Sequence, residues 1–110
     1  MAKLFGVHEI ELKPDVTEQE FEAFMSTVMA IPDMTNHVLK GIRGERKGKY
    51  LILAEAKRVE DRDQWFTDED YLNEAGIQWF EDHPDVARWF EKFDTLCSGF
   101  GGVFTDYVEF

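Results

Sequence analysis

The chain has 110 residues, 44% of them hydrophobic, and its 23 acidic and 12 basic side chains give a net charge of −11. This size and apolar content predict one globular domain covering residues 1–110 and argue against an intrinsically disordered chain. The acidic surface carries no basic stripe, so nucleic acid and anionic membranes, which are both negatively charged, are poor candidates as partners.

Cys97 is the single cysteine in the sequence. An intramolecular disulfide and a zinc site of the CxxC type are therefore both impossible, and one thiol fits a reducing compartment. The opening residues MAKLFGVHE lack the apolar segment of a signal peptide. No apolar run approaches the roughly 20 residues that a membrane-spanning helix needs. We therefore expect a cytoplasmic protein that does not enter a membrane.

The N-terminal part of the chain predicts a strand followed by a helix. Residues 3–12 alternate in hydrophobicity as a half-buried strand does. One face of this strand is Leu4, Gly6, His8, Ile10 and Leu12, and the other is Phe5, Val7, Glu9 and Glu11. Thr17 and Glu20 then form the pattern of a capping box, and Pro32 marks the helix end. The apolar stripe of this helix is Phe21, Phe24, Met25 and Val28.

Residues 37–57 predict a β-hairpin, with strands at 37–44 and 50–57 and a turn at 45–48 that contains Gly48. Alternation in the second strand puts large and small side chains on one face, namely Tyr50, Ile52, Ala54 and Ala56. The stretch after the hairpin is too long for one ordinary helix, so we divide it. Short helices are expected at 59–66 and 71–81, on either side of an acidic break at 67–70.

A third helix of this arm is expected to begin at Pro84, because proline suits the first helical position. Its apolar stripe is Val86, Trp89, Phe90 and Phe93. Gly99 stands just past its end, where a left-handed residue is favoured. A last strand is expected at 103–110, entered through Gly101 and Gly102.

The predicted order β-α-β-β-α-β, with an expanded second helical arm, indicates an α+β protein of the ferredoxin-like layout. In this layout a four-stranded antiparallel sheet carries its helices on one face. The other face would expose a large apolar patch formed by Phe5, Val7, Leu51 and Leu53. A second copy of the sheet is the simplest cover, so we expect a two-fold homodimer packed sheet to sheet.

Four segments resemble the dimeric α+β barrel superfamily: HEIELKPDV leading into TEQEFEAFM, then KGKYLILAEAKRVEDRDQWF, and the closing TDYVEF. The resemblance covers nearly the whole chain and is closest to bacterial members without an assigned activity. The superfamily includes cofactor-free monooxygenases of antibiotic biosynthesis, haem-degrading monooxygenases, polyketide cyclases and stress-responsive barrel proteins. The resemblance implies a pocket between the sheet and the helices, but the fold alone selects no chemistry.

His8 is the first candidate site residue, because the resemblance implies that its face of the strand lines the pocket. Gly6, Ala54 and Ala56 are placed on the same face, and their small side chains leave room for a ligand. A histidine in this position can act as a general base or orient a substrate carbonyl. The alternative is a histidine that makes one structural hydrogen bond.

Tyr107 and Asp106 lie on opposite faces of the last strand, and one of these faces must line the pocket. Tyr107 is the second catalytic candidate, as a hydroxyl donor to a substrate oxygen, and the alternative is a hydroxyl that binds a structural partner in the core.

Trp65 and His83 are further pocket candidates that follow from the resemblance. Trp65 stands near a pocket tryptophan of the haem-degrading relatives, yet Gly76 and Ile77 occupy the region where those relatives carry the iron-ligating histidine. The pair His83-Pro84 is similar to a His-Pro dipeptide of the cyclase-like proteins, in which the histidine pairs with one on the first strand. The alternatives are core packing for Trp65 and a helix-capping role for His83.

No metal or nucleotide motif accompanies these candidates. HxxxH, HExxH, a glycine-rich phosphate loop and a calcium-loop pattern in the acidic run 60–70 are all absent from the sequence, so no metal and no cofactor are expected. The sequence favours a module that binds a small apolar or aromatic molecule in the helix–sheet cleft. The alternative is a cofactor-free monooxygenase or cyclase-like enzyme with His8 as its base. Haem degradation ranks third.

Overall fold

The structure is a computed structural model that describes residues 3–27, 31–99 and 103–110. Val28, Gly101 and Gly102, which the sequence assigns to a helix stripe and a strand entry, lie outside this range. The described elements are, in chain order, β1 (Leu4–Ile10), α1 (Glu18–Met25), β2 (Met34–Lys40), β3 (Tyr50–Ala56), α2 (Val59–Asp63), α3 (Glu74–Asp82), α4 (Pro84–Leu96) and β4 (Val103–Val108).

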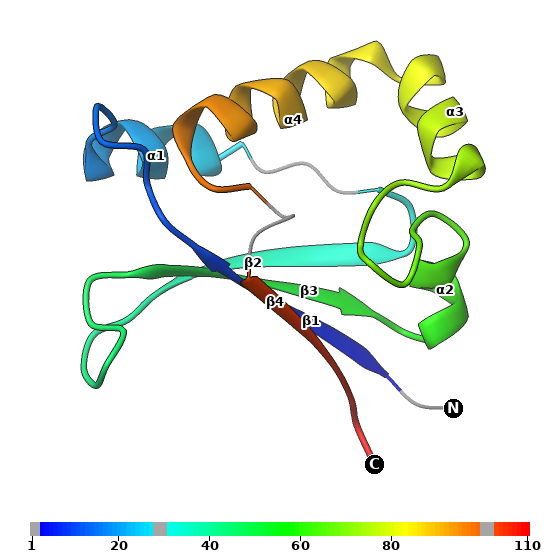
Figure 1. Ribbon diagram of the computed structural model, residues 1–110, viewed down its shortest axis with the longest axis horizontal. Helices are drawn as coiled ribbons and strands as arrows, with labels where there is room; N and C mark the ends of the chain where they lie inside the picture. Colours follow the sequence, from blue (N-terminus) through cyan, green and yellow to red (C-terminus); the bar gives the residue numbers. More distant parts are fainter. Residues whose placement is uncertain (1–2, 28–30, 100–102) are drawn as a thin grey trace.

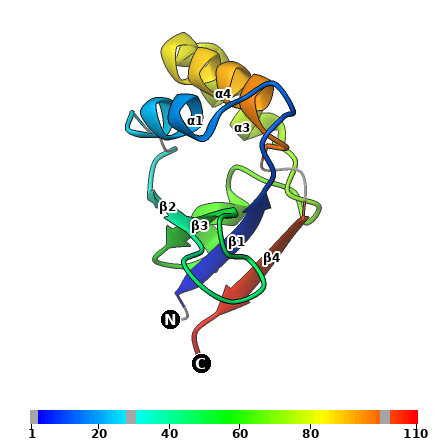
Figure 2. The same cartoon turned by 90° about the vertical axis from the view of Figure 1, so that its left-hand side faces the viewer.

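The four described strands form one antiparallel sheet in the order β2-β3-β1-β4 (Figure 1). β1 lies inside the sheet, where His8 pairs with Ile52 of β3 on one side and with Phe104 of β4 on the other. Figure 2 shows α1, α3 and α4 together on one side of this sheet. The arrangement is an α+β fold consistent with the expected ferredoxin-like layout.

The hydrophobic core fills one end of the space between helices and sheet. Phe21 of α1 and Phe93 of α4 are completely buried against Ile52 of β3. The rings of Phe24 and Trp89 stack at 4.9 Å and join α1 to α4. The strand face beneath them carries its large residues at this end, and farther along it changes to alanine and glycine. The helix–sheet space is therefore filled at one end and hollow at the other.

Helix α1 begins as the sequence predicts and ends earlier. The Thr17 hydroxyl accepts a hydrogen bond from the Glu20 backbone N–H at 3.1 Å, which satisfies one of the free donors of the first turn. The helix ends at Met25 rather than near Pro32. The hydroxyls of Ser26 and Thr27 donate to backbone carbonyls three residues back, and such bonds compete with the helical pattern.

The hairpin register also differs from the expected one. β2 runs over Met34–Lys40 instead of 37–44, and Ile42 is 73% exposed in the connection to β3. Gly41 and Gly44 explain the difference. A Cβ at Gly41 would lie 2.1 Å from the Arg46 carbonyl oxygen, and Gly44 has a φ of +94°. The glycines therefore turn the chain out of the strand before the expected turn at 45–48.

The second helical arm has the three expected helices, with changed boundaries. α4 starts at Pro84 and is followed by Gly99 with a φ of +75°, as predicted. α2 ends at Asp63 rather than at Phe66, and α3 starts at Glu74 behind the N-cap Asn73. Residues 66–72 form a tight loop between them, which we call the 66–72 loop. β4 ends at Val108, two residues before the predicted end.

Candidate functional site

A cavity of about 480 Å³ occupies the hollow end between the sheet and the second helical arm. Its floor comes from strand residues, including Leu4, Gly6, His8 and Ala54. Its walls include aromatic side chains from the helical arm, namely Phe66, Tyr71, Phe80 and Phe90. The cavity exists because the strand face changes from Ile52 and Tyr50 under the core to alanine and glycine here, as small residues leave unfilled space.

His8 lies on the cavity floor and is 5% exposed. Its ring stacks against Phe104 of the neighbouring strand at 5.9 Å. Its Nδ1 is 3.7 Å from Asp70 Oδ2, which is longer than a hydrogen bond and becomes an ion pair when the imidazole is protonated. Asp70 therefore lies behind His8 as a carboxylate neighbour, contributed by the 66–72 loop.

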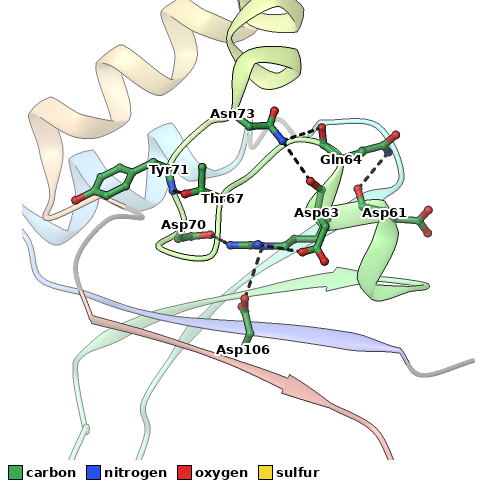
Figure 3. Close-up of polar contacts among 9 residues, drawn as sticks. Asp61, Asp63, Gln64, Thr67, Asp70, Tyr71, Asn73 and Asp106 are labelled. Carbon is green, nitrogen blue, oxygen red and sulfur yellow. Dashed lines mark hydrogen bonds and ion pairs between the residues drawn. The ribbon is translucent and has the colours of Figure 1, made fainter.

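Arg62 of α2 connects the other charged groups of the site. Its Nη2 donates to Asp70 and its Nη1 donates to Asp63, both at 3.1 Å. Its Nε lies 3.7 Å from Asp106 Oδ2. In Figure 3 Asp106 rises from β4 below the cluster while Asp70 reaches in from the 66–72 loop. The Arg62 side chain is only 6% exposed, so this guanidinium is held inside the protein by carboxylates from three segments.

The 66–72 loop holds Asp70 in place through its own hydrogen bonds. The Thr67 N–H donates to the Tyr71 carbonyl at 2.7 Å, and the Tyr71 N–H donates to the Thr67 hydroxyl at 3.2 Å. Asp70 adopts a φ of +67°, which is uncommon for a residue with a side chain. Burial raises the pKa of the Asp70 carboxyl above its usual value, while His8 and Arg62 oppose that shift. Asp70 thus combines a left-handed backbone with a largely desolvated carboxylate, and features of this kind are enriched at functional sites.

Gly6 lets His8 and Asp106 approach the same point above the sheet. A Cβ added at Gly6 would lie 2.9 Å from Asp106 Oδ1 and 3.3 Å from His8 Nε2. The second ring nitrogen of His8 and a carboxylate oxygen of Asp106 therefore share the space directly over Gly6. This placement gives the cavity one polar end, which we call the polar end and define as His8, Arg62, Asp70 and Asp106.

The structure brings together some of the predicted site residues. His8, Gly6 and Ala54 line the cavity, as the sequence predicts. Ala56 lies on the same strand face and is 1% exposed, but it is not part of the cavity lining.

Tyr107 lies elsewhere, and its expected place in the pocket is wrong. It pairs with Phe5 on the opposite face of the sheet and is 56% exposed. Its neighbour Asp106 takes the cavity-facing position instead. The strand alternation separates these two residues correctly, but it does not say which face meets the helices.

Trp65 and His83 also lie outside the cavity lining. The centres of the Trp65 and Trp79 rings are 6.1 Å apart. His83 is exposed at the junction of α3 and α4, where its Nδ1 is 2.7 Å from the Trp79 carbonyl oxygen and its ring stacks on Trp79 at 4.1 Å. The structure thus gives His83 a helix-end role and does not pair it with His8.

Sequence reasoning did not place Arg62 or Asp70 in the site, and it left open whether the Asp106 face of the last strand meets the helices. Arg62 and Asp70 belong to a strongly charged stretch that is typical of a solvated surface, and only the fold shows that both side chains are largely covered. An arginine one turn before an apolar Trp-Phe pair was the one available signal, since the alkyl part of arginine packs well against aromatic rings. Arg62 lies 5.6 Å from the centre of the Phe66 ring.

Within the described residues, no group of three or more His, Cys, Asp or Glu side chains is arranged to hold a metal ion. None of the described helices is both long and apolar enough to cross a bilayer. Comparisons with protein-family models, curated proteins and solved structures found no match for this chain.

Proposed function

We propose that the protein binds a small, largely apolar molecule in the helix–sheet cavity, with a polar group of the ligand at the polar end. The cavity itself is the observation that carries this proposal. Its volume of about 480 Å³ lies within the range of roughly 300–1,000 Å³ that is usual for small-molecule sites. Aromatic walls and a few convergent polar groups are also the usual composition of such a site.

The buried charges of the polar end support a binding role. Desolvating a guanidinium and several carboxylates costs more than an apolar core of equal volume would. Arg62 and Asp70 are nevertheless enclosed beside a cavity, with side chains 6% and 9% exposed. Groups of this kind gather at functional sites because their electrostatic interactions are strong there.

Filling the cavity tests the proposal. The Ala54→Leu substitution extends a side chain into the cavity from the floor. We expect the neutral fluorescent probe N-phenyl-1-naphthylamine to bind the parent protein at one saturable site and to bind this variant about tenfold more weakly or worse. Ala23→Leu, the same change at an exposed position of α1, is the matched control and should leave binding unchanged. Equal binding by all three proteins would contradict the proposal.

A second candidate function is acid–base catalysis without a cofactor, of the monooxygenase or cyclase type. The specific observation in its favour is the position of His8, with Asp70 near Nδ1 and with Nε2 over Gly6 at the cavity floor. A carboxylate behind an imidazole orients the ring and stabilises its protonated form. The test is turnover of an aromatic substrate, measured as oxygen uptake or as ring closure. Under this candidate function, His8→Ala loses the turnover and still binds the neutral probe.

We also propose that the protein is a dimer in which a second copy covers the outer sheet face, the face opposite the helices. Apolar side chains recur there on four strands, namely Phe5, Val7, Leu39, Leu51, Leu53, Val103 and Tyr107. Leu39 is 47% exposed and Val103 is 63% exposed in the single chain. An apolar face of this kind on an otherwise acidic protein indicates an interaction surface.

Charge pairing on the outer sheet face favours a second copy as the occupant. Glu9 is bound by Arg46 at 2.9 Å, and Glu55 is contacted by Lys3 and His37 at 3.6 Å each. The acidic residues of this face thus have basic partners, although the whole chain carries a net charge of −11. Two such faces can meet without repulsion. Light scattering at micromolar concentration should give twice the chain mass of 12.9 kDa, and a single 12.9 kDa particle would contradict the dimer.

A further inference from the structure

We propose that the cavity selects a cationic apolar ligand, an ammonium group on an aromatic or aliphatic body, and rejects carboxylates. This inference rests on the proposed binding function and specifies its ligand class. It follows from the signs of the charges that line the cavity, from the contacts that already occupy Arg62, and from the position of Asp106.

The ionisable lining of the cavity is negative in sum. Asp70, Asp94 and Asp106 contribute three carboxylates, whereas Arg62 contributes one guanidinium. Protonation of His8 would add one positive charge and still leave the carboxylates in excess. An apolar enclosure strengthens this field because water cannot screen it well. The lining therefore disfavours a ligand anion while these carboxyls are ionised, and burial raises the pKa values of Asp70 and Asp94.

The terminal nitrogens of Arg62 are already engaged by carboxylates of the protein. Its two terminal nitrogens donate to Asp63 and Asp70, and its Nε lies nearest to Asp106. A carboxylate ligand could bind both terminal nitrogens only by displacing Asp63 or Asp70, and at Nε it would meet the Asp106 carboxylate, whose Oδ2 lies 3.7 Å away. The two-pronged donor geometry that a carboxylate prefers is therefore already used by the protein.

Asp106 is the carboxylate that a ligand cation can reach. Its distance of 3.7 Å to Arg62 Nε is beyond hydrogen-bond range, and Arg62 Nε has no hydrogen-bond partner among the described residues. The Asp106 side chain is 29% exposed, and its Oδ1 projects over Gly6 into the cavity. Asp70, by contrast, accepts a hydrogen bond from Arg62 and is 9% exposed. An ammonium group over Gly6 would pair with Asp106.

The aromatic walls suit the same ligand class. Phe66, Phe80, Phe90 and Tyr71 line the same cavity as the polar end. Aromatic faces attract cations as well as apolar groups, since the ring quadrupole is negative over the face. A hydrophobic amine would therefore find a favourable partner for its body and another for its charge.

The test uses one ring with three head groups: 1-naphthylmethylamine, 1-naphthylmethanol and 1-naphthoate. Each compound displaces N-phenyl-1-naphthylamine from the parent protein, from Asp106→Asn and from Asp85→Asn. The last variant removes an equal charge from an exposed position of α4 outside the cavity. For the parent protein we expect the amine to bind at least about tenfold more tightly than the carboxylate, with the alcohol between them.

In Asp106→Asn the advantage of the amine should shrink to about threefold or less, while the affinity for the alcohol stays within about twofold. Asp85→Asn should behave as the parent protein does. Tightest binding of the carboxylate, or equal effects of the two variants, would overturn the charge selection. If the alcohol binds and the three head groups do not differ in affinity, the charge selection is wrong while the proposed binding function still holds. If none of the three compounds binds, the proposed function fails with it. The ranking in the parent protein does not depend on how any variant folds.

Discussion

The contact between Tyr50 and Glu22 couples single ionisable groups to the stability of the core. The Tyr50 hydroxyl donates to the Glu22 carboxylate, and Lys40 also contacts Glu22, at 3.3 Å. The hydrogen bond from Tyr50, followed by that from Lys40, lowers the pKa of Glu22 below its usual value of 4.5. Burial and the bond to Glu22 raise the pKa of Tyr50 from 10.0 to about 12. The bond thus needs an ionised Glu22 and a neutral Tyr50.

We therefore predict a pH window for the contribution of Tyr50 to stability. Because the pKa of Glu22 is lowered in the folded protein, the stability gained from the ionised Glu22 is fully present above pH 4.5. This stability is lost as the pH falls through the lowered pKa. Because the pKa of Tyr50 is raised in the folded protein, the stability gained from its neutral hydroxyl is fully present below pH 10.0. This stability is lost as the pH rises toward about 12. Tyr50→Phe should unfold at lower urea concentration than the parent protein at pH 7, and this difference should narrow at both extremes. Tyr71→Phe, which removes an exposed hydroxyl, is the control. A difference that stays constant with pH would contradict the assignment.

The sequence predicted which residues belong to the site only for strand residues whose face could be assigned. Alternation in the first strand put His8 and Gly6 on one face, and the resemblance to the barrel superfamily, rather than the alternation, implied that this face lines a cavity. Asp106 and Tyr107 could be separated but not assigned, since β4 has no strong apolar alternation to show which face meets the helices. Asp70 reaches the site through a loop with a left-handed residue, and nothing local in the sequence specifies that direction.

At the scale of elements, α2 and the 66–72 loop form one unit through Arg62. The sequence predicts α2 and a break at 67–70, but it does not predict the path of the loop, because that path depends on bonds to residues outside the loop. The Asn73 side chain donates to the carbonyls of Asp63 and Gln64, and the Asn73 N–H donates to the Trp65 carbonyl at 3.0 Å. These bonds end the helix early and fold the chain back over the cavity.

Removing the guanidinium of Arg62 should therefore disrupt this unit. Arg62→Met keeps most of the side-chain volume but leaves Asp70 without its buried cation, so we expect a loss of about 3–5 kcal/mol in the free energy of unfolding. The deficit should shrink as the pH falls, because burial raises the pKa of Asp70 and a neutral carboxyl needs no cation. Urea unfolding at several pH values measures both effects. Arg58→Met, at a side chain 49% exposed, is the matched control and should cost much less. Equal losses in the two variants would show that Arg62 does not act as a buried ion.

At the scale of the whole molecule, the two faces of the sheet serve different purposes. One face holds the core and the cavity, and the outer sheet face is apolar and balanced in charge. This division was predictable from alternation in β1 and β3, where buried and half-buried residues follow each other strictly. The hollow half of the inner face was less predictable, because a run of small residues shows where space exists and not what encloses it.

The proposed dimer depends on the middle of the outer sheet face, where Val7 pairs with Leu53 on one side and with Thr105 on the other. Val7→Glu places an unpaired carboxylate at this point. Because a two-fold interface repeats each residue in both copies, the substitution adds two carboxylates close together. We expect light scattering to show the mass of the parent protein falling to the single-chain value of 12.9 kDa in this variant. Ala23→Glu adds the same charge to the exposed face of α1, on the other side of the molecule, and should leave the mass unchanged. A Val7→Glu protein that keeps the double mass would place the interface elsewhere, whereas loss of the double mass in both variants would point to net charge rather than to this face.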